Sequence, residues 1–253
     1  MERWKGRVAL VTGASAGIGA AVCKVLVEAG MNVVGAARGV EKIEILANSL
    51  HDAKGTLTAV KCDVTKEEDI YNLFREIKGK FGGVDICVNN AGISYDKTLL
   101  DGSVAEWRNM TDVNIIAPCI CSKLSIESMR ERGIDDGHII NVNSTSGHRV
   151  SGFAEVHFYA GTKYALTAIT EGLRQEMREL KSHIRISKIS PGFVETEFFT
   201  RMFSSNEEKA QEIYKSRMFL QPEDIANSVL HIISSPPHVE INDILVRPTE
   251  QAS

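Results

Sequence analysis

The sequence has no long apolar run and few cysteines. No segment approaches the ~18 consecutive apolar residues of a membrane-spanning helix, and residues 1–7 are charged where a signal peptide would be apolar. The five cysteines are odd in number, form no Cys-x-x-Cys pair and lie at no metal-ligand spacing from a histidine. We therefore expect a soluble, cytoplasmic chain with free thiols, no membrane span and no metal site.

Neither sign of charge dominates the chain. The sequence has 29 Lys and Arg against 33 Asp and Glu, a formal net charge of −4, and no long block of one sign. A general nucleic-acid binder needs concentrated positive charge, so no nucleic-acid partner is predicted. The 6 prolines and 20 glycines form no linker or repeat, so nothing marks a second domain.

Short β-branched segments alternate with helical stretches along the 253 residues. Strands are expected at residues 8–12, 32–37, 57–62, 85–88, 138–143 and 184–190. Residues 19–29, 66–80 and 162–180 carry apolar side chains at helical spacing. This alternation predicts a parallel sheet with helices on both faces. We predict a single α/β domain over residues 1–253, doubly wound and of Rossmann type, with a helical substrate flap at about residues 196–220, where aromatic residues lie on a charged background.

A glycine-rich turn follows the first predicted strand. Glycines at positions 13, 17 and 19 lead into a predicted helix. Glycine allows a tight turn and close approach of a ligand, and a helix N-terminus offers free N–H groups to a pyrophosphate. The expected dinucleotide contacts are Gly13, Ser15, Ala16, Gly17, Ile18 and Gly19. Taken alone, such a turn could also be a strand-to-helix connection without a ligand.

The second predicted strand ends at Arg38 and Gly39, without a carboxylate. A ribose 2′-hydroxyl would prefer a carboxylate there, whereas an arginine can hold a 2′-phosphate. NADP(H) is therefore favoured over NAD(H) as the cofactor. The alternative is that Arg38 is a solvated surface charge.

Polar motifs follow later in the chain. They are Asn89-Asn90-Ala91-Gly92, Asn114 in a predicted helix, Ser144 after the fifth strand, and Tyr159-Ala160-Gly161-Thr162-Lys163. Tyr159 and Lys163 would share one helix face, where an ammonium would lower the tyrosine pKa from ~10 toward neutrality. We predict that Tyr159 exchanges a proton with the substrate oxygen. Singly, Ser144 could be a helix cap, Asn114 a buried polar group and Tyr159 a packed aromatic residue.

Taken in this order, the motifs between Val8 and about Thr196 resemble those of the short-chain dehydrogenase/reductase family. The length of the chain also resembles that of the family, so the resemblance extends over almost the whole chain. Residues 1–4, 136–141, 146–150 and 247–251 point to one subgroup. The resemblance implies that Lys163 and Tyr159 also contact the cofactor, that Ser144 binds the substrate oxygen, and that Asn114 supports a water relay toward Lys163. It implies a homodimer or homotetramer, and further cofactor contacts at Asp63, Val64, Asn90, Ala91, Gly92, Pro191, Gly192, Val194 and Thr196.

Two features depart from the family's usual pattern. Ser144 and Tyr159 lie farther apart, which leaves the loop shape open, and the terminal strand lacks a glycine-rich ending. Asp63 could instead cap the helix that follows it. His148 and His157 are expected to be packing or surface residues.

Aromatic residues surround the predicted site. Five of nine phenylalanines lie between Phe193 and Phe219, which predicts an apolar pocket for a small lipophilic alcohol or carbonyl. A steroid, an isoprenoid such as farnesol, or a small dicarbonyl would fit. The expected substrate contacts are Ser144, Tyr159, Phe193, Phe199 and Phe203. Alternatively, the phenylalanines anchor the flap, or the protein is a non-catalytic NADP(H)-binding sensor or scaffold.

Overall fold

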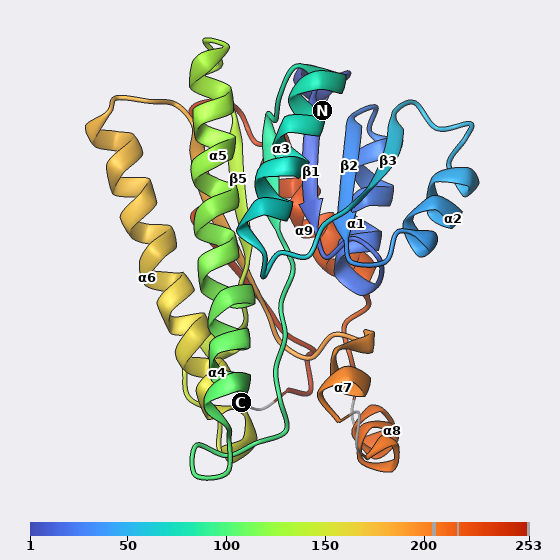
Figure 1. Cartoon of the computed structure of the whole chain (residues 1–253), viewed down its shortest axis with the longest axis vertical. Coiled ribbons are helices and arrows are strands. Elements are labelled where there is room, and N and C mark those ends of the chain that lie inside the picture. The colour runs from blue at the N-terminus through green and yellow to red at the C-terminus, as the bar shows by residue number, and fades with distance from the viewer. Residues whose placement is uncertain (204–205, 217, 252–253) are drawn as a thin grey trace.

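The strands form one parallel sheet. The computed structural model describes residues 1–203, 206–216 and 218–251. Within them the strand order is β3-β2-β1-β4-β5-β6-β7, with every neighbouring pair parallel (Figure 1). The strands are β1 (Val8–Thr12), β2 (Asn32–Ala37), β3 (Thr56–Lys61), β4 (Ile86–Asn89), β5 (His138–Val142), β6 (Arg185–Pro191) and β7 (Asp243–Val246).

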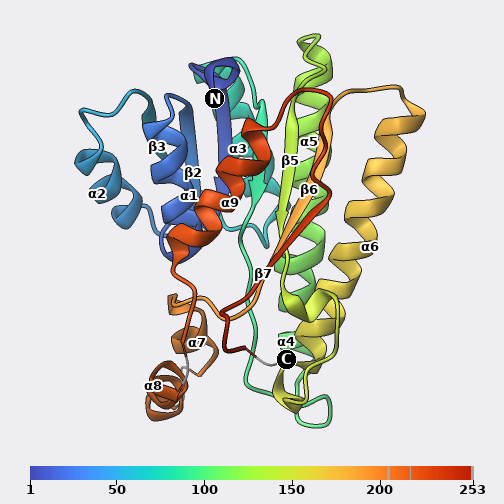
Figure 2. The ribbon, with the colours of Figure 1, turned by 180° about the vertical axis from the view of Figure 1, so that it is seen from behind.

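Helices cover both faces of the sheet. The helices are α1 (Gly17–Glu28), α2 (Glu41–Ser49), α3 (Glu67–Phe81), α4 (Val104–Thr111), α5 (Ala117–Glu131), α6 (His157–Glu179), α7 (Glu197–Met202), α8 (Glu207–Ser216) and α9 (Pro222–Ser234). In Figure 1, α3, α5 and α6 lie in front of the sheet, whereas α1 and α9 are in front in Figure 2. Along β1, Ala9 and Val11 pack with the α1 and α9 layer, and Val8 and Leu10 pack with the other layer. The predicted doubly wound fold is therefore confirmed.

Several element bounds differ from those the sequence pattern predicts. Strands β1 and β2 match the prediction, but α6 begins at His157, five positions before the predicted start. Its first turns therefore include Tyr159, as the spacing argument for Tyr159 and Lys163 requires. All five cysteines are free thiols, and every one except the half-buried Cys119 is buried. Among the described residues, no helix is both long enough and apolar enough to cross a membrane.

The sheet order reverses between β1 and β4. From β1 the chain builds outward to β2 and β3, and it then returns to continue on the other side with β4. In open α/β sheets, ligands bind outside the carboxyl ends of the strands at such a reversal. Helices α4, α7 and α8 lie beyond this end of the sheet in Figure 1. We call residues 196–220 the flap; positions 204–205 and 217 of it lie outside the described residues.

Candidate active site

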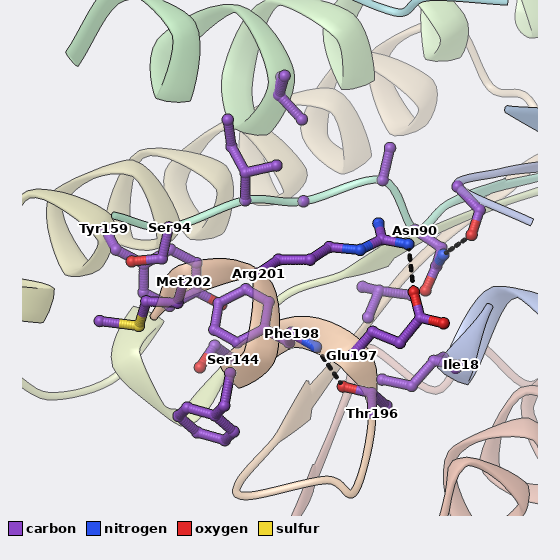
Figure 3. A pocket seen from close by; sticks show the side chains of 18 of the residues that line it. Ile18, Asn90, Ser94, Ser144, Tyr159, Thr196, Glu197, Phe198, Arg201 and Met202 are labelled. Atoms are coloured by element: carbon purple, nitrogen blue, oxygen red, sulfur yellow. Dashed lines mark hydrogen bonds and ion pairs between the residues drawn. The ribbon is translucent and has the colours of Figure 1, made fainter. Parts of the chain in front are cut away.

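A cavity of about 820 Å³ lies at the carboxyl ends of the central strands (Figure 3). It is lined by residues that follow β1, β2, β3, β4, β5 and β6. Of the predicted site residues, all except Gly19 and Asn114 line it. The topology therefore brings together segments that are spread over most of the chain.

The glycine turn forms a close-fitting cradle at one end of the cavity. Gly13 and Gly17 have φ values of +66° and +54°, which side chains rarely adopt. A Cβ at Gly13 would lie 2.9 Å from Ala91 Cα, and a Cβ at Gly17 would lie 2.9 Å from Thr196 Cγ2. Gly19 does not line the cavity; its missing Cβ lets α1 pack against the turn, because a Cβ there would lie 2.3 Å from Gly13 O.

The N-terminus of α1 opens into this cradle. Its N-cap residue Ala16 provides no side-chain hydrogen bond, and the first turn contains no acidic residue. The terminal N–H groups and the positive end of the helix dipole are thus left for an anion. Asn90 secures the turn, since its Nδ2 donates to Thr12 O at 2.9 Å and Gly13 O at 3.2 Å. The cradle fits the pyrophosphate of a dinucleotide.

Beside the cradle, in the part of the cavity that we call the cofactor groove, the chain leaves β2 at Arg38; Ala14 N of the turn donates to Ala36 O at 3.2 Å, and Arg38 is exposed and lines the cavity near Asp63. Asp63 Oδ1 accepts hydrogen bonds from Thr65 N at 3.1 Å and Thr65 Oγ1 at 2.8 Å. Partial burial raises the pKa of Asp63, but these bonds and the charge of Arg38 outweigh it, so the pKa lies below its ordinary value. The N-cap of α3 is Lys66, so the alternative that Asp63 caps this helix is wrong.

Ser144, Tyr159 and Lys163 lie together in the cavity, and in Figure 3 Ser144 and Tyr159 are on the side away from Ile18. Lys163 Nζ lies 5.6 Å from the centre of the Tyr159 ring and donates to Val142 O at 2.9 Å. Ser144 hydrogen-bonds the Tyr159 side chain, and its Oγ also accepts from Ser146 N at 3.1 Å. Ser144 is therefore both the cap of a short 3₁₀ turn and a partner of the tyrosine.

Asn114 is fully buried behind this group. It lies in a π-helical turn, where its Oδ1 accepts from Ile93 N at 3.0 Å. Its Nδ2 donates to Ile93 O at 2.9 Å and to Thr162 Oγ1 at 3.1 Å. The side chain is thus a satisfied buried amide that ties α6 to the segment after β4, and its part in a water relay stays a prediction.

The pKa of Tyr159 differs in direction from the sequence-based prediction. Burial raises the pKa of Tyr159 to about 12, although the hydrogen bond with Ser144 opposes this. Burial also lowers the pKa of Lys163 to about 8. The prediction that Lys163 would bring the tyrosine pKa toward neutrality is wrong for the free protein, because burial disfavours both charged forms. Tyr159 therefore keeps its proton at neutral pH and is suited to donate it.

Replacing Lys163 with methionine is expected to stabilise the protein at pH 7 by about 2 kcal/mol. The fall of the lysine pKa from 10.5 to about 8 corresponds to about 3 kcal/mol at neutral pH, less about 1 for the lost bond to Val142 O. The unfolded chain binds more protons between these pH values, so wild-type stability rises there relative to the variant.

Urea unfolding of both proteins between pH 7 and 10.5 measures this difference. The advantage of Lys163→Met is complete below the folded pKa of about 8 and falls above it; as the pH approaches 10.5 it reverses to a deficit of about 1 kcal/mol, because only the loss of the bond to Val142 O remains. A difference that does not change with pH would contradict the argument.

Aromatic side chains cover the remaining part of the cavity. The ring centres of Phe198 and Tyr159 are 5.6 Å apart, and half-buried Phe193 and Phe199 extend this surface. Phe203 is only 4% exposed and packs with Met202 and other flap residues. All four phenylalanines line the cavity, and Phe203 is in addition buried within the flap, so contact with a substrate and anchoring of the flap both stay predictions.

Several cavity residues have no recognisable sequence signal. Phe198 belongs to the predicted aromatic run but not to the predicted substrate contacts. Which ring faces Tyr159 depends on how the short helix α7 is rotated about its axis, and the sequence does not reveal that rotation. Gln251 Oε1 accepts from Phe193 N at 3.1 Å, so the C-terminal segment forms one wall. Lys42, Glu197 and Arg201 also line the cavity.

The longer loop between Ser144 and Tyr159 is held by its two histidines. His148 Nε2 lies 2.8 Å from Ser190 Oγ, and His157 Nε2 lies 3.1 Å from Ser151 O. These contacts agree with packing roles for both residues.

Comparison with known proteins agrees with this geometry. Residues 7–207 match the family model of short chain dehydrogenases. The chain belongs to this family. It is 55% identical to dehydrogenase/reductase SDR family member 11 of Gallus gallus, over 100% of both chains. It is also 44% identical to the farnesol dehydrogenase of Aedes aegypti, over 98% of each.

A solved family structure has a closely similar fold. The closed form of serine dehydrogenase complexed with NADP+ superposes with a TM-score of 0.87 at 29% identity, over 97% of this chain and 96% of that one. The subgroup that residues 1–4, 136–141, 146–150 and 247–251 predict is that of family member 11 and the farnesol dehydrogenase-like relatives of invertebrates. That prediction is confirmed.

Proposed function

We propose that the protein is an NADP(H)-dependent oxidoreductase that interconverts a lipophilic secondary or allylic alcohol and its carbonyl. The observation that carries this proposal is the group of Tyr159, Ser144 and Lys163 in a cavity that continues into the glycine cradle. The cradle can hold a dinucleotide while the tyrosine meets a substrate oxygen, which is the arrangement hydride transfer with coupled proton transfer requires.

The chemistry of the groove supports NADP(H) as the cofactor. Gly13 to Ile18 and the N-terminus of α1 would hold the pyrophosphate, and Arg38 would hold a ribose 2′-phosphate. Serine dehydrogenase, whose fold is similar, was solved with NADP+. When bound, the cofactor supplies or accepts the hydride, and the protein contributes orientation and the proton.

Tyr159 performs the proton step in this proposal. During carbonyl reduction its hydroxyl donates a proton to the substrate oxygen, for which the raised pKa keeps it protonated. Ser144, whose hydroxyl donates to Tyr159 in the free protein, turns its single hydrogen to the substrate oxygen and orients that oxygen. The Lys163 ammonium stabilises the phenolate that forms. In oxidation these steps run in reverse.

The aromatic wall supports a lipophilic substrate. A steroid or an isoprenoid alcohol such as farnesol would place its apolar body against Phe193, Phe198 and Phe199. The Aedes aegypti relative is named as a farnesol dehydrogenase. A small dicarbonyl would occupy only the part of the cavity beside Tyr159.

Consumption of NADPH, followed by its absorbance, tests the function with a ketosteroid, farnesal and diacetyl as substrates and NADH as the comparison cofactor. Turnover of at least one substrate, faster with NADPH than with NADH, is expected. If none reacts in either direction while NADPH binds tightly, the sensor hypothesis replaces the enzyme.

Phe198→Ala is expected to raise the KM for the preferred lipophilic substrate about tenfold, since burial of an aromatic surface is worth roughly 1–3 kcal/mol. The KM for diacetyl should change little. Phe203→Ala should instead lower the free energy of unfolding by about 3 kcal/mol, because Phe203 is buried among flap residues. Equal KM effects of the two variants on every substrate would contradict this assignment.

We also propose a cytoplasmic homodimer or homotetramer. Apolar side chains of the α4 to α6 region are exposed, including Val104, Ile116 and Tyr164, and such a surface favours association. Light scattering of the purified protein gives the mass of the assembly.

A further inference from the structure

Three charged side chains connect the flap to the opposite side of the cofactor groove. Lys42, in the first turn of α2, lies with its Nζ 2.6 Å from Glu197 Oε1. Arg201 Nη2, one turn farther along α7, lies 2.6 Å from Glu197 Oε2. In Figure 3 the long side chain of Arg201 extends toward Glu197, and all three residues line the cavity. One carboxylate therefore holds two cations inside the groove.

The position of this carboxylate relates it to the cofactor's phosphates. Lys42 follows Arg38 by four residues, on the side of the groove where a 2′-phosphate would bind. Thr196, the neighbour of Glu197, packs over Gly17 at the N-terminus of α1, where the pyrophosphate would bind. Glu197 thus lies between the two places where phosphate groups are expected.

We propose that Glu197 takes the place of a phosphate in the free protein. Its carboxylate forms ion pairs with Lys42 and Arg201, and these pairs break when NADP(H) binds. Lys42 then pairs with the 2′-phosphate and Arg201 with the pyrophosphate. This inference rests on the proposed use of NADP(H). It makes Lys42 a residue that discriminates between NADP(H) and NAD(H), and Glu197 a competitor of the cofactor.

The exchange is physically favourable. All three side chains are well exposed, at 61% for Lys42, 43% for Glu197 and 56% for Arg201, and exposed ion pairs are weak. Phosphate groups offer more negative charge and more acceptor oxygens than a carboxylate. Breaking the Lys42–Glu197 pair also removes the ion pair that links α2 to α7, the helix that carries Phe198 beside Tyr159.

Fluorescence titration of NADPH and NADH measures binding without turnover and tests the exchange. Glu197→Gln is expected to tighten NADPH about fivefold, which is the scale of one or two exposed ion pairs. Lys42→Gln should weaken NADPH about fivefold and leave NADH unchanged. Arg201→Gln should weaken both cofactors. The affinity for adenosine 2′,5′-bisphosphate should change as that for NADPH does: it should fall in Lys42→Gln and rise in Glu197→Gln.

Glu195→Gln is the matched control, because it removes the same charge two positions away. The Glu195 carboxylate is outside the cavity and accepts from Gln221 Nε2 at 2.8 Å, so NADPH affinity should not change. Circular dichroism confirms that each variant is folded. The inference is overturned if Glu197→Gln binds NADPH no more tightly than wild type, or if Lys42→Gln affects both cofactors equally. Failure of the wild-type protein to bind NADPH would instead overturn the proposed function.

Discussion

Tyr159→Phe is expected to lower turnover by about two to four orders of magnitude, the range typical for loss of a general acid or base. The phenyl ring keeps the packing against Phe198, while the hydroxyl that donates the proton is gone. The Kd for NADPH should stay within about twofold of wild type, since the glycine cradle is untouched. Turnover rates and NADPH titrations of the same preparation measure both quantities.

Tyr164→Phe provides the control for this substitution. Tyr164 lies on the same helix and is 42% exposed, so loss of its hydroxyl should leave turnover unchanged. A Tyr159→Phe enzyme that retains more than about a tenth of wild-type turnover would exclude the tyrosine as the essential acid.

Gly19→Ala is expected to lower the free energy of unfolding by about 3 kcal/mol and to weaken NADPH binding by more than about tenfold. The new Cβ would lie 2.3 Å from Gly13 O and 2.5 Å from Asn90 Nδ2. Gly13 O is a backbone atom, so the turn must open, which moves the N–H groups of the cradle away from the pyrophosphate. Urea unfolding and NADPH titration measure the two effects.

Gly172→Ala is the matched control in the interior of α6. A Cβ at Gly172 would have no neighbour within 4 Å, so alanine should stabilise this helix by about 0.5–1 kcal/mol. If Gly19→Ala and Gly172→Ala both raised or both lowered the free energy of unfolding, the close packing at Gly19 would not explain the effect of Gly19→Ala.

The site was predictable wherever its chemistry depends on neighbours in the sequence. The glycine turn follows a strand of β-branched residues, and both its conformation and its fit to a phosphate come from missing Cβ atoms within a few residues. Tyr159 and Lys163 meet because four residues make about one helical turn. Alternating β-branched and helical segments likewise predicted the parallel sheet, because these periods are local properties of the chain.

Other properties depend on residues far away in the sequence. The pKa of Tyr159 lies above its ordinary value because several elements together bury it, an effect that the four-residue spacing to Lys163 does not reveal. Lys42 and Glu197 are 155 positions apart, and Gln251 reaches Phe193 only because β7 pairs with β6.

The boundary between the two kinds of property is physical. Local sequence determines backbone conformation and which side chains share one turn or one strand face, and this was enough for the fold, the cradle and the Tyr159–Lys163 pair. Burial and charge pairing are sums over segments that meet only after folding. Tertiary packing therefore decided which phenylalanine faces Tyr159 and in which direction the pKa values of Tyr159 and Lys163 are shifted. It also decided that Glu197 is the carboxylate that pairs with Lys42 in the groove.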